Sequence, residues 1–303
     1  MPDSSPRTSP ANLKPTPIPR IAVFLCDHAH PDVQATSGDY DKIFHTLLSS
    51  SYPPSKVKQG EEIFILDAYN VRDSTTDYPE DVDVYDGIIL TGSAANAYEN
   101  VPWINKLVGY VAWVAKDKPK IKLFGICFGH QIIARSLGTE VVPNDGKWEV
   151  GITPITLSEV GKKVFGVEDD TVNLQQMHRD HVPSLPPNCL LLGSTKISYN
   201  QGFIRLLPGT PSSTSTHTQT ESVPPFHLSQ IQIFTVQGHP EFSQQIVSSL
   251  INTREKNGIL TKEIADSARE RGSWRNDGVG VVGRAVWRIL VDERIQPEEG
   301  LEG

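Results

Sequence analysis

A cysteine between two glycines is the residue of this sequence best placed to do chemistry. Cys127 lies in the segment Gly125-Ile126-Cys127-Phe128-Gly129, after the apolar run Ile121 to Ile126 and before a run of helical periodicity, Gln131 to Leu137. This pattern predicts a strand, a sharp turn and a helix, with the sulfur exposed at the turn. The N–H groups and the dipole at the start of a helix favour the thiolate form. The segment therefore predicts a cysteine nucleophile.

A candidate base follows a second apolar run, Ile231 to Val236. His239 comes just after that run and is followed by Pro240 and Glu241. Proline biases the residue before it toward an extended conformation, in which residues two apart point the same way. The Glu241 carboxylate would then orient the His239 imidazole, which takes the thiol proton. An isolated His-Pro-Glu is more often a solvated turn, but together with Cys127 it indicates a catalytic triad.

The first half of the chain alternates short apolar runs with amphipathic ones. Strands are expected at Ile21–Leu25, Glu62–Leu66, Tyr85–Leu90 and Ile121–Ile126, and helices at Tyr40–Leu48, Pro102–Val114 and Phe128–Leu137. This alternation predicts an α/β fold with a mainly parallel open sheet and helices on both faces. Ligands collect at the carboxyl ends of parallel strands. Because Gly92-Ser93, Cys127 and His239 all follow strand ends, we expect them to meet at one edge.

The second half predicts shorter strands and then helices. The strands are expected at Glu149–Leu157, Thr171–Leu174, Leu190–Ser194 and Gly202–Leu206, and the helices at Phe242–Arg254, Thr261–Arg271 and Val281–Val291. Residues 1–20 and 208–230 are crowded with Pro, Ser and Thr, which predicts a disordered N-terminal tail and a flexible insertion. The expected organisation is this tail, one domain at 21–257 that carries the insertion, and a C-terminal helical extension at 258–303.

The composition argues against several classes of protein. The chain has 303 residues and a formal net charge of -8 without a basic stripe, so no nucleic-acid partner is expected. No apolar run reaches the ~18 residues of a transmembrane helix, so no membrane association is expected either. Three cysteines, Cys26, Cys127 and Cys189, fit a reducing compartment, and we expect the cytoplasm. The absence of Cys-x-x-Cys and His-x-x-x-His spacing predicts no metal site, and no cofactor is expected.

The two motifs resemble those of a known family, the class I (triad) glutamine amidotransferases. The segments Gly125 to Gln131 and Gly238 to Glu241 are specific to that superfamily. Further segments look like its stand-alone branch, which includes plant γ-glutamyl peptidases and fungal proteins similar to the amidotransferase domain of GMP synthase. These segments are Gly38 to Tyr40, Thr91 to Ser93, Trp148 to Gly151 and Met177 to Val182. The resemblance covers roughly Ile21 to Ile251 and implies a flavodoxin-like, three-layer fold.

The resemblance also implies a role for each catalytic residue. Cys127 would attack the side-chain amide or γ-glutamyl carbonyl of the substrate. His239, oriented by Glu241, would act as general base and then as general acid to the leaving amine. The backbone N–H groups of Phe128 and of the Gly92-Ser93 turn would form the oxyanion hole.

Three further residues match family positions around the bound glutamyl group. Gln131 matches a position near that group, and the backbone of Met177 and His178 matches the loop that holds its α-amino and α-carboxylate ends. A serine commonly stands in the family where this chain has Met177, which weakens the match at that position. His178 and Asp180 fit the His-x-Asp pattern of the family, in which they would shape the loop.

The resemblance leaves the substrate open between glutamine and a γ-glutamyl compound such as glutathione. Glutamine hydrolysis would supply ammonia to an acceptor, and since the chain lacks an ATP-binding loop, that acceptor would be a separate enzyme or a reactive molecule. Some relatives in this branch belong to secondary-metabolite pathways. Two other readings are a non-catalytic binding protein that retains the fold and an α/β-hydrolase. The hydrolase is disfavoured because its acid should precede the histidine, whereas Glu241 follows His239.

Overall fold

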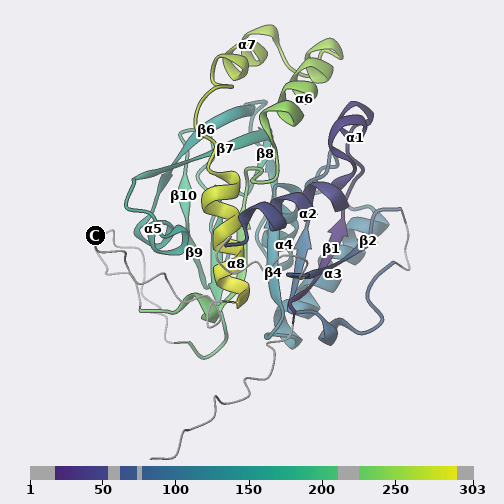
Figure 1. Cartoon of the computed structure of the whole chain (residues 1–303), viewed down its shortest axis with the longest axis vertical. Helices are drawn as coiled ribbons and strands as arrows, with labels where there is room; N and C mark the ends of the chain where they lie inside the picture. The colour runs from purple at the N-terminus through teal and green to yellow at the C-terminus, as the bar shows by residue number, and fades with distance from the viewer. Residues whose placement is uncertain (1–17, 54–61, 74–76, 211–224, 292–303) are drawn as a thin grey trace, which may run out of the picture.

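A seven-stranded sheet forms the centre of the computed structural model, which describes residues 18–53, 62–73, 77–210 and 225–291 (Figure 1). In spatial order its strands are β2 (Ile65–Asn70), β1 (Arg20–Leu25), β3 (Gly87–Leu90), β4 (Lys122–Ile126), β12 (Ile231–Val236), β11 (Phe203–Leu206) and β9 (Cys189–Leu191). The strands from β2 to β12 pair in parallel, and β11 and β9 extend the sheet antiparallel. The mainly parallel sheet predicted from the sequence is confirmed.

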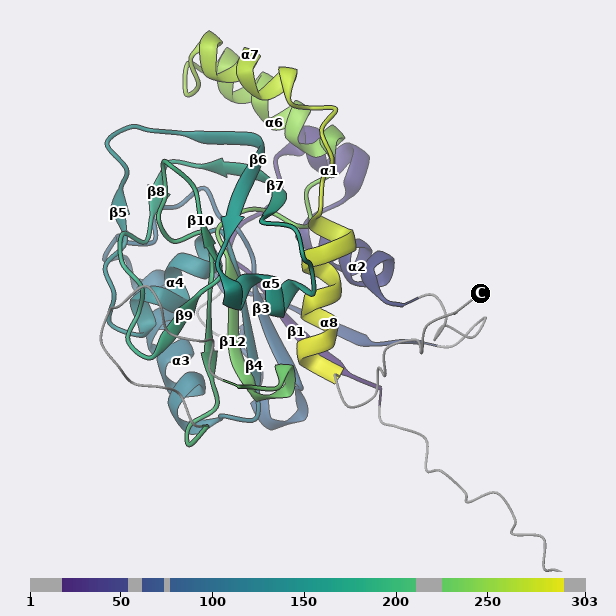
Figure 2. The same cartoon turned by 90° about the vertical axis from the view of Figure 1, so that its left-hand side faces the viewer.

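The central strands are buried on both faces because their side chains alternate between two helix layers. On β4, Phe124 and Ile126 belong to one core, whereas Leu123 belongs to the other. The first core includes α2 (Tyr40–Ser51), α5 (Glu159–Phe165) and α8 (Arg284–Val291), and the second includes α3 (Pro102–Asp117) and α4 (Phe128–Ser136). Figure 2 shows α3 and α4 on one side of the sheet and α2 and α8 on the other.

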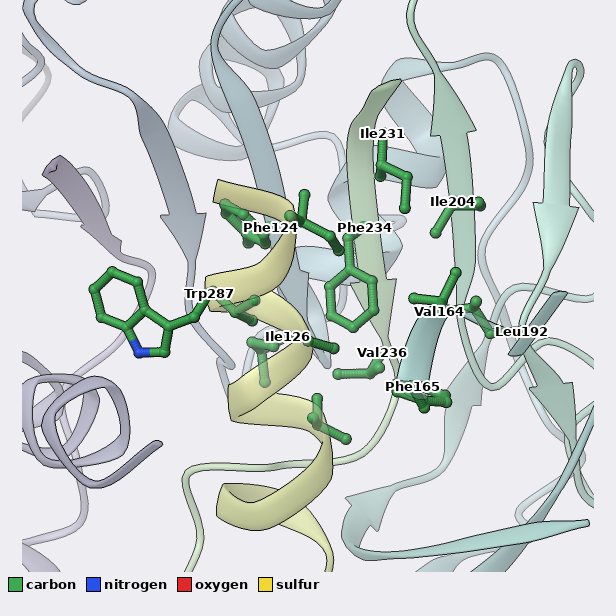
Figure 3. Packing of buried hydrophobic residues seen from close by; sticks show 14 of the residues in the cluster. Phe124, Ile126, Val164, Phe165, Leu192, Ile204, Ile231, Phe234, Val236 and Trp287 are labelled. Carbon is green, nitrogen blue, oxygen red and sulfur yellow. The ribbon is translucent and has the colours of Figure 1, made fainter. Parts of the chain in front are cut away.

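The C-terminal helix α8 covers one face of the sheet through Trp287. Its indole is fully buried, donates from Nε1 to the carbonyl of Leu48 at 2.9 Å, and meets Tyr52 edge-on with ring centroids 5.0 Å apart. Figure 3 shows α8 lying over the sheet, with Phe124 and Phe234 on the strands beside it. The sequence predicts this helix, although its first residues form a turn of π-helix, Gly278–Gly283.

An additional group of strands and helices lies over one end of the central sheet. It contains a small antiparallel sheet, a two-stranded ribbon and three helices, with α6 and α7 at the top of the view in Figure 1. Its strands are β6 (Glu149–Leu157), β7 (Thr171–His178), β10 (Gly193–Ser194), β5 (Val142–Pro143) and β8 (Asp180–His181), and its helices are α1 (Pro31–Ser37), α6 (Gln244–Lys256) and α7 (Lys262–Glu270). A third core that includes Val33, Val150, Met177 and Ile246 joins α1, β6, β7 and α6.

Three strands differ from their predicted bounds. The predicted strand Glu62–Leu66 is wrong: β2 covers Ile65–Asn70, because this edge strand pairs with β1 from Ile65 onward. Its residues are half-exposed, so polar side chains are tolerated where the prediction required an apolar run. The predicted Leu190–Ser194 is divided between β9 and β10, which belong to different sheets. The predicted Thr171–Leu174 continues to His178, since its partner β6 is equally long.

Two short helices were not predicted at all. α5 begins after Ser158, whose hydroxyl accepts the N–H of Gly161, and ends at Gly166 in the left-handed conformation. α1 begins with Pro31 at its first position. Both are too short to show a clear helical period, which is why only their caps signal them.

Several predictions concern segments that are only partly described. Residues 1–17 of the predicted tail and residues 211–224 of the predicted insertion lie outside the described residues. At the end of that predicted insertion, Phe226 and Leu228 are buried against the first core. Residues 258–291 contain α7, the π-helical turn and α8. Among the helices described, none has the length and apolar character needed to cross a bilayer.

Candidate active site

The turn that carries Cys127 has an unusual backbone conformation. Cys127 immediately precedes α4 with φ 53° and ψ -105°, a region that residues other than glycine rarely adopt. Its N–H donates to the carbonyl of Val236 at 3.0 Å, which continues the parallel pairing of β4 with β12 for one more residue. The predicted strand–turn–helix is therefore present, and the cysteine stands at the carboxyl end of a central strand.

Gly125 and Gly129, on either side of Cys127, have no room for a side chain. A Cβ on Gly125 would lie 2.7 Å from the carbonyl oxygen of Gly129, and a Cβ on Gly129 would lie 2.3 Å from that of Leu90. Both distances are far below van der Waals contact, and both partners are backbone atoms. Glycine at these positions lets α4 begin directly against β3 and β4, which fixes where the sulfur stands.

His239 is held by three contacts. Its N–H donates to the carbonyl of Gln175 at 2.8 Å, and its Nδ1 lies 2.8 Å from Oε1 of Glu241. Its ring stacks on Phe242 with the centroids 4.0 Å apart and the planes 2° from parallel. The imidazole and the carboxylate are both buried. The convergence of His239 with Glu241 that the sequence led us to expect is present in the structure.

The structure brings Cys127 and His239 together around Gly92. A Cβ on Gly92 would lie 2.9 Å from Cε1 of His239 and 3.8 Å from Cβ of Cys127, so both side chains flank this glycine. Burial disfavours a charged imidazole, but the negative charges of Cys127 and Glu241 outweigh it and raise the pKa of His239 to about 10. The imidazole of His239 is therefore favoured in its protonated form.

The turn after β3 is anchored by a carboxylate. Asp27 accepts from the hydroxyl of Ser93 at 3.1 Å and from the N–H of Ala94 at 2.8 Å. The side chain of Ser93 is thereby occupied, which leaves only the backbone of the Gly92-Ser93 turn to face Cys127. Phe128 is the first residue of α4, so its N–H has no acceptor within the helix. Both expected oxyanion donors thus lie next to the cysteine.

Two glutamines link the sulfur to the opposite wall. Nε2 of Gln237 lies 3.6 Å from the sulfur of Cys127, within hydrogen-bond range for sulfur. Oε1 of Gln237 accepts from Nε2 of Gln131 at 3.1 Å, and the same Nε2 donates to the carbonyl of Asp180 at 3.0 Å. Gln131 is buried, and it holds this chain of amides in place. Gln237 therefore contacts the sulfur of Cys127, although no role was predicted for it from the sequence.

The predicted loop residues Met177 and His178 form that opposite wall. His178 is buried with Nδ1 3.1 Å from the carbonyl of Asp180 and Nε2 3.1 Å from Oε2 of Glu149. Burial alone raises the pKa of Glu149, but its bonds to His178 and Thr195 outweigh this and lower it. His178 is thus turned toward a buried carboxylate and shapes the wall.

Asp180 carries a buried oxygen without a hydrogen-bond partner among the described residues. Within the described residues, its Oδ1 makes no hydrogen bond, and the nearest cation is Nε of Arg179 at 3.7 Å. Burial raises the pKa of Asp180. A buried carboxylate of this kind needs a cationic or hydrogen-bonding partner.

A cavity of about 580 Å³ unites these groups. The predicted site residues that line it are Ser93, Cys127, Phe128, Gln131, Met177, His178 and His239. Glu241 and Gly92 are not among the lining residues: Glu241 contacts Nδ1 of His239, and Gly92 lies between His239 and Cys127. No cluster of His, Cys, Asp and Glu suited to a metal ion occurs in the described part of the chain.

The other two cysteines are absent from this cavity lining. Cys26 and Cys189 are buried, and desolvation raises the pKa of each thiol to about 12. Both therefore remain protonated structural thiols.

Comparison with known proteins agrees with the motifs. The sequence model named "Glutamine amidotransferase class-I" matches residues 66–251, more than half of the chain. The chain belongs to this family. A glutamine amidotransferase-like protein of Schizosaccharomyces pombe is 32% identical over 83% of this chain and 90% of its own length. The γ-glutamyl peptidase 3 of Arabidopsis thaliana is 27% identical over 82% of this chain and 88% of its own length.

A solved structure supports the same fold. The glutamine amidotransferase of Thermotoga maritima superposes with a TM-score of 0.61 at 16% identity, and covers 91% of this chain and 100% of its own. At this identity the likeness concerns the fold alone. It agrees with the α/β architecture and the parallel sheet described above.

The contacts that four residues make around this cavity were not predicted from the sequence. Gln237 adjoins the His-Pro-Glu motif, and Phe242 directly follows it, so position next to a motif was the available signal. Asp180 was noticed only as part of a family pattern. Arg254 lies well downstream on α6 and gave no signal, because an arginine on an amphipathic helix is ordinarily a solvated residue.

Proposed function

We propose that this protein hydrolyses the amide bond of glutamine or of a γ-glutamyl compound through a thioester on Cys127. The observation that carries this proposal is the meeting of Cys127 and His239 on either side of Gly92, with Glu241 bound to the far nitrogen of the imidazole. A nucleophile, a base and a group that orients the base are the minimum for such chemistry.

In the first step, the sulfur attacks the γ-carbonyl carbon of the substrate. The N–H groups of Phe128 and of the Gly92-Ser93 turn bind the oxygen as it gains negative charge. Nδ1 of His239 is engaged by Glu241, so Nε2 carries the proton that passes to the leaving nitrogen. The carbon–nitrogen bond breaks, the amine or ammonia departs, and the glutamyl group remains on Cys127 as a thioester.

In the second step, water replaces the amine. His239, now neutral, takes a proton from the water as the water oxygen attacks the thioester carbon. The carbon–sulfur bond breaks, glutamate leaves, and the thiolate–imidazolium pair is restored. The chain needs no metal or redox partner for either step.

The glutamyl end has matching groups in the same cavity. The free Oδ1 of Asp180 is suited to the α-ammonium group, since it is buried and lacks a hydrogen-bond partner among the described residues. Gln131 holds the Asp180 carbonyl and thereby the position of this loop. A cationic substrate group would satisfy the carboxylate that burial otherwise destabilises.

Release of glutamate tests the proposal directly. Purified protein is incubated with glutamine and, separately, with glutathione, and free glutamate is measured for the wild type and for Cys127→Ala. We expect glutamate from at least one substrate, and no glutamate above background from the variant. Absence of turnover with both substrates, or turnover that survives Cys127→Ala, would contradict the proposal.

Labelling and ester hydrolysis distinguish the two other classes. A glutamine-like electrophile that labels Cys127 without any turnover would favour a non-catalytic binding protein. Hydrolysis of small esters in preference to amides would favour the α/β-hydrolase reading. Transfer of ammonia to an acceptor enzyme and a place in secondary metabolism remain predictions from the resemblance.

A further inference from the structure

The cavity is larger than glutamine requires. Even at the ~30 Å³ that one water molecule occupies per non-hydrogen atom, glutamine fills roughly 300 Å³. The cavity measures about 580 Å³ and extends from Cys127 to the α6 residues Leu250, Thr253 and Arg254. Substantial space therefore lies beyond the volume of a glutamyl group.

Arg254 lies on the wall of this space and has no anionic partner among the described residues. Its guanidinium has no hydrogen bond and no carboxylate within salt-bridge distance among the described residues. Its contact is with Trp148, whose ring centroid lies 5.6 Å from the guanidinium carbon. Arg179 lies 5.9 Å from the same ring, so two cations flank one aromatic side chain at the cavity. A guanidinium stays charged in proteins and favours planar carboxylates.

The surroundings of Arg254 favour the binding of an anion. Arg254 is partly withdrawn from water, and desolvation lowers its pKa, while the negative charge of Cys127 opposes this effect. Of the other two arginines of the cavity wall, Arg72 pairs with Asp27, and Nε of Arg179 lies 3.7 Å from Oδ1 of Asp180.

We propose that Arg254, which lies over the ring of Trp148, forms a carboxylate-binding subsite that makes acidic γ-glutamyl compounds the substrates of this cavity. This inference rests on the proposed function. Two carboxylates carry the required chemistry: the α-carboxylate of the glutamyl group and a carboxylate on the leaving amine, such as the glycine end of glutathione. Arg254 discriminates among substrates only if it binds the leaving-group carboxylate, because every glutamyl substrate carries the α-carboxylate.

Kinetics of Arg254 variants test the subsite. Arg254→Met keeps the apolar stem over Trp148 and removes the charge, Arg254→Lys keeps the charge without the planar fork, and Lys256→Met removes an exposed charge from the same helix as a control. Glutamine, glutathione and the glycine-ethyl ester of glutathione are compared as substrates. We expect Arg254→Met to raise KM by about 10- to 100-fold, Arg254→Lys to raise it less, and Lys256→Met to leave it unchanged.

The pattern across substrates identifies the carboxylate. A rise for glutathione that is absent with its ester and with glutamine assigns Arg254 to the leaving group. An equal rise for all three substrates assigns it to the α-carboxylate. If Arg254→Met retains the melting temperature of the wild type and changes KM by less than about twofold with every substrate, the subsite does not exist.

A binding measurement separates this inference from the proposed function. Glutathione and glutamate are titrated into Cys127→Ala and into Cys127→Ala/Arg254→Met by calorimetry, which needs no turnover. Weaker binding to the double variant supports the subsite even if the wild type releases no glutamate. Equal binding to both proteins overturns the subsite and leaves the hydrolase proposal to its own assay.

Discussion

The side chain of Gln237 links the reacting sulfur to the substrate-binding wall. Its Nε2 points at Cys127, and its Oε1 is held by Gln131, which also holds the carbonyl of Asp180. A hydrogen bond to an anion is stronger than one to a neutral atom. We therefore propose that Gln237 is a positioning residue, which orients the sulfur of Cys127 through this hydrogen bond.

Replacing Gln237 with leucine removes this bond and keeps a side chain of similar bulk. A hydrogen bond to a charged group contributes about 1.5–3 kcal/mol, so we expect kcat to fall about 10- to 100-fold. The pH midpoint for alkylation of Cys127 by iodoacetamide should also move upward. Gln245→Leu, at an exposed position on α6, is the control. An unchanged alkylation midpoint in Gln237→Leu would exclude this role.

His239 makes the stability of the protein depend on pH. Its pKa rises from 6.5 to about 10 on folding, because the negative charges of Cys127 and Glu241 outweigh its burial. A raised pKa means that the folded state holds a proton that the unfolded state has lost. This stabilisation is complete below pH 6.5 and is lost as the pH rises to about 10.

Urea denaturation of the wild type and of His239→Asn at several pH values measures this effect. We expect the free energy of unfolding to fall more steeply for the wild type than for the variant between pH 6.5 and about 10. Comparison with the variant removes the contributions of titrating groups that do not interact with His239, whereas Cys127, which faces His239, contributes to the difference. Parallel curves for the two proteins would show that His239 holds no extra proton in the folded state.

Sequence analysis identified the candidate catalytic residues more completely than the residues that support them. Cys127, His239 and Glu241 occur in short motifs whose residue types are rare together, and the structure brings them to one place. Phe242 and Arg254 are common residue types whose roles arise from stacking and from the lack of an anion. Such roles depend on contacts between distant segments, which no local pattern records.

At the scale of elements, the junction of β4 and α4 determines where the nucleophile stands. The helix begins so close to β3 that a methyl group on Gly129 would overlap the carbonyl of Leu90 at 2.3 Å. The carbonyl of Leu90 belongs to the backbone and cannot move away as a flexible side chain could. Close packing of helix against strand is thus a condition for the position of Cys127.

Two glycine-to-alanine substitutions test this junction. Gly129→Ala forces backbone apart, so we expect destabilisation by about 1–3 kcal/mol or more and a large loss of activity. Gly109 lies within α3 with open space around its Cα, so Gly109→Ala should stabilise the protein by about 0.5–1 kcal/mol. Chemical denaturation of both variants measures whether each substitution lowers or raises the free energy of unfolding. A neutral Gly129→Ala would contradict the close approach of α4 and β3.

The long elements of the fold were predictable, and the short ones were not. β4 and α3 carry strong apolar patterns, so their type and approximate bounds follow from periodicity alone. β2 was displaced because an edge strand needs fewer apolar residues, and α5 was missed because seven residues cover only about two turns. Bounds therefore depend on pairing partners, which the sequence of one segment does not contain.

At the scale of the whole molecule, the C-terminal segment contributes to the main core. α8 brings Trp287 against α2 and the sheet, with its indole bonded to Leu48 and its ring 5.5 Å from that of Phe64. The sequence predicted a helical extension after residue 257. The burial of Trp287 leads us to propose that α8 unfolds together with the sheet rather than as a separate unit.

Trp287→Ala tests this cooperativity. Loss of a buried tryptophan costs about 3–5 kcal/mol, so the midpoint of urea unfolding should fall sharply while the transition remains single. Trp287→Phe keeps most of the ring and loses the hydrogen bond to Leu48, so we expect a smaller loss. Because Trp287 does not line the cavity, KM should remain unchanged in folded protein of either variant. Two separate transitions by circular dichroism and fluorescence would instead mean that α8 forms an independent unit, and that the sheet holds the site without it.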